Sequence, residues 1–71
     1  MQVTGILVFE DLEGGFWGIV GSDGSRYEIE NKIPDDLAEA GLEVEAEVEP
    51  VGGVSIRQWG TPVRVLEIKR A

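Results

Sequence analysis

The chain has 71 residues, enough for a single domain (1–71) with one modest hydrophobic core. It contains no cysteine and no histidine, which excludes disulfides, thiolate or imidazole metal ligands and the usual acid–base group of enzymes. Fourteen acidic and six basic residues give a formal net charge of -8 at pH 7, which argues against binding to nucleic acids or anionic membranes.

No apolar run approaches the roughly 20 residues of a membrane span. The opening stretch MQVTGILVFEDLEG lacks the basic residues and the cleavage signal of a secretory leader. We therefore expect a cytoplasmic protein. We also expect a monomer, because the acidic excess favours mutual repulsion between copies.

The first three predicted elements are strands. Residues 3–10 are apolar and β-branched around Gly5, which predicts a strand with a bend at the glycine. Residues 16–21 and 25–30 form the arms of a predicted hairpin, because the Asp23-Gly24 pair between them is a strong turn signal.

Two registers of this hairpin are compatible with the sequence. A two-residue turn at Asp23-Gly24 places Val20 opposite Tyr27, whereas a three-residue turn with Gly24 in the left-handed conformation places Ile19 opposite Tyr27. We favour the three-residue turn because it makes one face of the hairpin wholly apolar. The members of that face are Trp17, Ile19, Tyr27 and Ile29.

The favoured register turns the opposite face of the hairpin away from the core. Arg26 and Glu28 of the third strand then face water, and Phe16 becomes an outward ring with glycines beside it in the sequence. Two interpretations of Phe16 are open. Either a loop or the last strand covers the ring in part, or the ring stacks on a ligand.

The segment NKIPDDLAEAG predicts a helix of one to two turns. Pro34 suits the first helical position, the two aspartates after it suit the positive end of the helix dipole, and Gly41 suits the stop. Such a short helix is not stable alone. We therefore expect Ile33 and Leu37 to pack onto the sheet.

Residues 42–49, LEVEAEVE, alternate without a fault and predict a strand with one wet face. The glutamates repeat at roughly 6.6 to 7 Å along that face, too far apart and too exposed for an acid–base couple. Neither they nor the DLEGG segment have the ligand density of a calcium loop. The sequence therefore predicts no metal and no cofactor.

Two more strand segments follow, VSIRQW and VRVLEIK, with a break at Gly60 and Pro62. Alternation places Ser55, Arg57 and Trp59 on one face of the first. Arginine beside tryptophan is a common recognition pair, because a ring face attracts cations and a guanidinium group binds carboxylates. The structural alternative has Arg57 neutralising a glutamate of residues 43–49 and Trp59 closing the barrel end.

Five strands with a helix between the third and the fourth is the order of the OB fold. The sequence therefore predicts an all-β protein, a five-stranded OB-fold-like Greek-key barrel with one short helix. A small SH3-like barrel is the alternative, and the helical segment disfavours it because such barrels normally have a loop or tight turn there.

Three motifs resemble the cold-shock-like branch of the OB-fold superfamily: the glycine at position 5, GGFWGIVGSDG and AGLEVEAEVE. Members of that family stack single-stranded nucleic acid on aromatic residues of the second and third strands. Phe16 matches the first of these aromatics, but Gly18 occupies the second position. Glu28 and Glu30 stand where the family would show aromatic or histidine side chains. The resemblance implies the fold without its nucleic-acid surface.

We predict a non-enzymatic module that binds a protein or another non-nucleic ligand through a wall of Phe16, Arg26, Arg57 and Trp59. The alternative is a diverged cold-shock-like binder of single-stranded nucleic acid, with Arg26, Arg57 and Arg64 gathered on one wall. No serine has a histidine or a nearby lysine to activate it, so we predict no catalytic activity.

Overall fold

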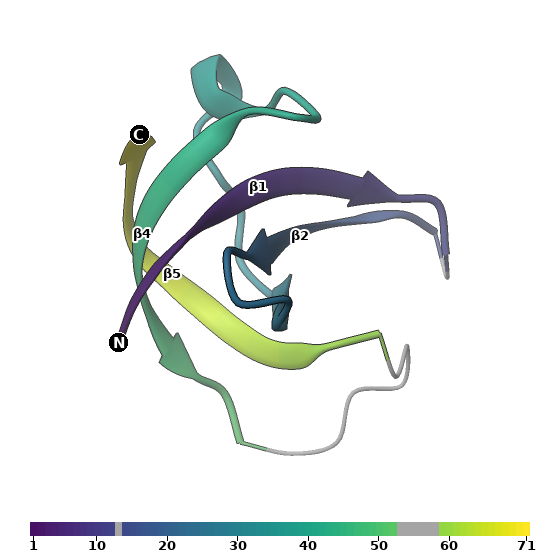
Figure 1. Cartoon of the computed structure of the whole chain (residues 1–71). Helices are drawn as coiled ribbons and strands as arrows, with labels where there is room; N and C mark the ends of the chain where they lie inside the picture. The colour runs from purple at the N-terminus through teal and green to yellow at the C-terminus, as the bar shows by residue number, and fades with distance from the viewer. Residues whose placement is uncertain (13, 53–58) are drawn as a thin grey trace.

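The computed structural model describes residues 1–12, 14–52 and 59–71, and it shows a closed five-stranded β-barrel (Figure 1). The strands are β1 (Gln2–Glu10), β2 (Phe16–Gly21), β3 (Arg26–Ile29), β4 (Glu43–Pro50) and β5 (Thr61–Arg70). A 3-10 turn, η1 (Asp35–Leu37), lies between β3 and β4.

The strands follow each other around the barrel in the order β1-β2-β3-β5-β4, and pairing of β1 with β4 closes it. Neighbouring strands are antiparallel, except that β3 and β5 run parallel. This arrangement confirms the prediction of an all-β, five-stranded, OB-fold-like Greek-key barrel.

Strand β1 belongs to both sides of the barrel. Its second half pairs with β2 and its first half pairs with β4, and the two ladders overlap at Gly5 and Ile6. A Cβ atom on Gly5 would collide with the carbonyl oxygen of Val20. Glycine is therefore required where β1 passes from one partner strand to the other.

The β2–β3 hairpin has the favoured three-residue turn. Ile19 pairs with Tyr27, the Gly21 N–H donates to the Ser25 carbonyl at 2.7 Å, and Gly24 has a φ of 90°. Trp17, which is half-buried like Tyr27, also packs against the core as predicted.

The expectation that Glu28 faces water is wrong, because only 1% of this residue is exposed. Glu28 does lie on the outward face of β3, but its neighbours cover that face. Gly18 of β2 pairs with it on one side and carries the indole of Trp59, and Pro62 of β5 pairs with it on the other. A buried carboxylate needs a polar interaction, and Glu28 makes one.

The predicted helix is a single 3-10 turn. Pro34 precedes it with an extended ψ of 138°, and Gly41 ends the segment with a φ of 93°. Ile33 and Leu37 are buried as expected. The turn therefore covers the barrel with two side chains and contributes little helical structure of its own.

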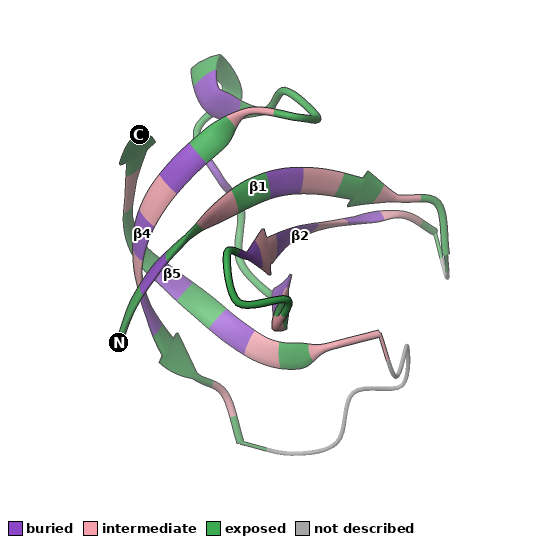
Figure 2. Ribbon diagram, viewed as in Figure 1, coloured by how far each residue is buried: buried purple, intermediate pink, exposed green. Residues whose placement is uncertain are grey.

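Burial alternates along β4, as Figure 2 shows in purple against pink and green. Val44, Ala46 and Val48 point into the core, and the glutamates between them are half-buried or exposed. The predicted wet face of this strand is confirmed. The core also takes side chains from the other four strands and from Ile33.

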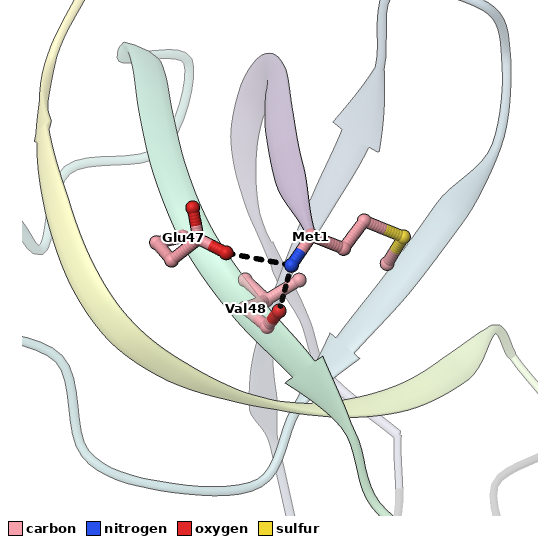
Figure 3. Close-up of polar contacts among 3 residues, drawn as sticks. All are labelled: Met1, Glu47 and Val48. Atoms are coloured by element: carbon pink, nitrogen blue, oxygen red, sulfur yellow. Dashed lines mark hydrogen bonds and ion pairs between the residues drawn. The ribbon is translucent and has the colours of Figure 1, made fainter.

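The N-terminal ammonium group ties the start of β1 to β4. It donates to Oε2 of Glu47 at 2.6 Å and to the carbonyl oxygen of Val48 at 2.8 Å (Figure 3). The ion pair is partly exposed, and pairs of this kind contribute about 0 to 1 kcal/mol.

The predicted strand VSIRQW, with Ser55 and Arg57, lies almost wholly outside the described residues. The predicted break is present at Gly60, which lies outside any strand. The break predicted at Pro62 is wrong, because β5 begins at Thr61 and includes Pro62.

Candidate functional site on the outward face of β1 and β2

The outward side of the β1–β2 pair carries apolar side chains in its central part. Leu7 and Ile19 point into the core, so the side chains that alternate with them point away from it. Ile6 is 38% exposed and pairs directly with Val20, and Val8 pairs with Gly18. We call Ile6, Val8, Val20 and the neighbouring Trp59 the outer apolar face.

Trp59 reaches this face because Gly18 has no side chain. A Cβ atom on Gly18 would lie 2.6 Å from Cζ3 of the indole. The ring also meets Phe16 edge to face, with 5.4 Å between ring centroids and 72° between ring planes. Gly18 and Phe16 therefore form the surface of β2 on which the Trp59 ring packs.

Arg26 of β3 also contacts the Trp59 ring, and we call Phe16, Gly18, Arg26 and Trp59 the cluster. Its Cζ lies 5.6 Å from the centroid of the Trp59 ring, a cation–π distance, and the residue itself is exposed. A Cβ atom on Gly60 would lie 2.7 Å from the Arg26 carbonyl oxygen, so the chain beside Trp59 passes close to β3. An exposed contact of this kind contributes about 0.5 to 1 kcal/mol.

The structure thus brings together three of the four predicted site residues, Phe16, Arg26 and Trp59, and the fourth, Arg57, lies outside the described residues. Phe16 points away from the core cluster but is only 5% exposed, so the covered interpretation of this ring holds. Trp59 is half-buried and lies on the outward face of β2, not over the barrel end.

Arg64 lies on β5, where its cross-strand partner is Glu49 of β4. The hairpin turn beside the cluster carries Asp23, whose pKa is lowered chiefly because its carboxylate accepts the backbone N–H of Ser25 at 3.0 Å. The pairing with Glu49 places an acidic residue opposite Arg64, one of the arginines of the nucleic-acid alternative.

A hollow of about 260 Å³ opens at the barrel end, where β2 and β3 are no longer paired. We call it the barrel-end groove. Its lining residues are Gly15, Phe16, Trp17, Ile29, Asn31, Lys32, Ile33, Asp35 and Ala38.

Sequence reasoning missed the role of Asn31. Its side-chain amide donates to the Val65 carbonyl oxygen and accepts the Val65 N–H, both at 2.8 Å. The side chain thereby extends the short β3–β5 ladder, which ends at Ile29 and Val63. An asparagine directly after a predicted strand was the available signal.

Sequence reasoning also missed the outward position of Ile6 and Val8. Alternation with Leu7 was the signal, but β1 is apolar on both sides, so its pattern does not identify an exposed face.

Within the described ranges, no three acidic side chains come together in a way that could hold a metal ion. Nor does that part of the chain contain a helix with the length and apolar character needed to cross a membrane.

Comparisons with protein-family models, with curated proteins and with solved structures each found no match to this chain.

Proposed function

We propose that this chain is a non-enzymatic binding module that recognises a partner protein through the outer apolar face and Arg26. The observation that carries the proposal is the direct pairing of Ile6 with Val20 on the outward side of the barrel, next to the half-buried ring of Trp59. Contiguous apolar side chains on a barrel exterior are typical of an interaction surface. The proposal includes the predicted monomer and cytoplasmic location.

The chemistry of the cluster suits a protein partner. Tryptophan and arginine are the residues that most often dominate binding energy at protein interfaces, usually inside a ring of less important contacts. Trp59 is held in place by Phe16 and Gly18, so little side-chain freedom is lost when a partner covers it. Ile6 and Val20 then supply apolar area around this anchor.

The same geometry weighs against the nucleic-acid alternative. A cold-shock-like binder stacks bases on free aromatic rings of the second and third strands. Here the indole of Trp59 covers Gly18, and the residue paired with Gly18 is the buried acid Glu28. The net charge of -8 also opposes the counterion release that drives such binding.

The test is affinity capture with the double variant Ile6→Thr, Val20→Thr, which keeps β-branched residues in both strands. Any partner identified with the natural chain should bind the variant at least tenfold more weakly, since tenfold corresponds to about 1.4 kcal/mol of lost burial. The matched control is Leu66→Thr, because Leu66 is an exposed apolar residue of β5. Equal capture by the double variant, with its fold intact by NMR, would refute the proposal.

A further inference from the structure

The barrel-end groove is lined by both apolar and polar residues. Beyond the last pair of the β2–β3 ladder, Gly18 with Glu28, the two strands are no longer paired, and the buried residues Ile29 and Ile33 line the opening. Sites for whole small molecules usually exceed roughly 300 Å³. A hollow of about 260 Å³ suits one large side chain better than a cofactor.

An aromatic surface continues from the groove to solvent. Trp17 lines the groove and meets Phe9 edge to face, with ring centroids 5.2 Å apart. Phe9 is 49% exposed, and its ring lies against Gly15, where a Cβ atom would stand 2.7 Å from Cζ. Leu12, also exposed, accepts the N–H of Gly15 in the adjoining turn.

Carboxylates lie on both sides of this surface. Glu10 ends β1 and Asp11 follows it on one side, and Asp35 and Asp36 begin η1 on the other. Lys32 is the basic residue of the lining, and its ammonium group already lies 4.0 Å from Asp35. The acidic excess favours a cationic partner, and exposed aromatic rings attract cations as well.

We infer that the barrel-end groove is a second recognition site, which takes one large apolar side chain from a lysine- or arginine-rich segment of a partner polypeptide. The apolar residue enters the groove over Ile29 and Ile33, and the basic residues beside it face the carboxylates and the Phe9 ring. This site is distinct from the outer apolar face, because it depends neither on Ile6 nor on Val20.

The test uses three synthetic pentapeptides with blocked ends, titrated at low salt into the ¹⁵N-labelled chain. Their sequences are KKFKK, KKAKK and EEFEE. KKFKK should change the NMR chemical shifts of the Gly15 and Ile33 amides and of the Trp17 indole N–H. The second should bind at least fivefold more weakly, because it lacks the apolar anchor, and the third should not bind.

Two matched variants locate the site. Ala38 lines the groove and Ala40 does not, although both are exposed on the segment between η1 and β4. Ala38→Leu should narrow the groove and weaken KKFKK at least fivefold, whereas Ala40→Leu should change its affinity less than twofold.

The inference fails if KKFKK does not bind, if KKAKK binds equally well, or if EEFEE binds as tightly. It also fails if the shifts lie away from the groove or if both leucine variants behave alike. The peptide series requires only the natural chain, so it decides the matter even if a variant does not fold. None of these results bears on capture through Ile6 and Val20.

Discussion

The indole of Trp59 lies on the backbone of Gly18, where a side chain of any size would displace it, since an added Cβ atom would stand 2.6 Å from Cζ3. This contact brings a residue that precedes β5 onto the outward surface of β2. The Trp59 ring thereby covers Gly18, the position at which a cold-shock-like protein would carry an exposed aromatic ring. The indole is half-buried and lies on the same face as Ile6 and Val20. The proposed interface depends on this arrangement.

Gly18→Ala should therefore displace the Trp59 ring from its packing position on β2. The new methyl group would meet the indole at 2.6 Å and the Tyr27 carbonyl oxygen at 3.0 Å, so we expect a loss of about 1 to 3 kcal/mol in the free energy of unfolding. Urea unfolding measures the loss, and the indole N–H shift of Trp59 reports the displacement.

Gly52→Ala is the matched control, because among the described residues no atom beyond its chain neighbours lies within 4 Å of a Cβ built at that glycine. It should change stability by less than about 0.5 kcal/mol. If the two alanine variants unfold at the same urea concentration, the Trp59 ring does not pack on Gly18 in solution.

Asn31→Ala should destabilise the barrel by about 1 to 3 kcal/mol. The change removes two hydrogen bonds to Val65 and leaves its backbone N–H and carbonyl groups without the side-chain amide. Thermal unfolding by circular dichroism is the measurement. Lys32→Ala alters the exposed neighbour and should be close to neutral, so comparable losses in both variants would contradict the role given to Asn31.

Leu7→Ala should cost about 2 to 5 kcal/mol, because this fully buried side chain fills the centre of the core from β1. The same substitution at Leu66, which is 56% exposed on β5, should cost far less. Chemical denaturation of both variants checks the prediction. A Leu66→Ala variant as unstable as Leu7→Ala would mean that the two strands are not oriented as described.

The pKa of Asp23 should be lower in the folded chain than in the unfolded chain, because the Ser25 backbone N–H and then the Ser25 side chain donate to its carboxylate. A lowered pKa gives stability that is fully present above the unfolded value and is lost as the pH falls through the folded value. The carboxyl ¹³C shift, followed with pH in buffer and in urea, measures both values.

Ser25→Ala keeps the backbone N–H, the larger of the two causes, and should preserve most of the lowering. Identical titration midpoints in buffer and in urea would show that the turn does not hold the Asp23 carboxylate near Ser25.

The sequence predicted the barrel because its local signals agree. Faultless alternation fixes the faces of β4, and the Asp23-Gly24 turn with an apolar hairpin face fixes the register of Ile19 against Tyr27. These features depend on residues close together in the chain, where turn geometry and burial act directly.

The site was harder to predict because it depends on contacts between distant segments. No residue near Gly18 in the sequence indicates that Trp59 will cover it, so two interpretations of Phe16 stayed open and Glu28 was wrongly expected to face water. Asn31 shows the same limit, since its partner Val65 lies on another strand. Only closure of the barrel brings these pairs together.

The most direct test of the central claim, that the face around Trp59 recognises protein and not bases, is a titration of the ¹⁵N-labelled chain with mixed single-stranded oligonucleotides at low salt. Low salt gives electrostatic binding its best chance. We predict no change at the Arg26 amide or at the Trp59 indole. Saturable shifts at both groups, reversed by added salt, would contradict the account and favour a cold-shock-like nucleic-acid binder.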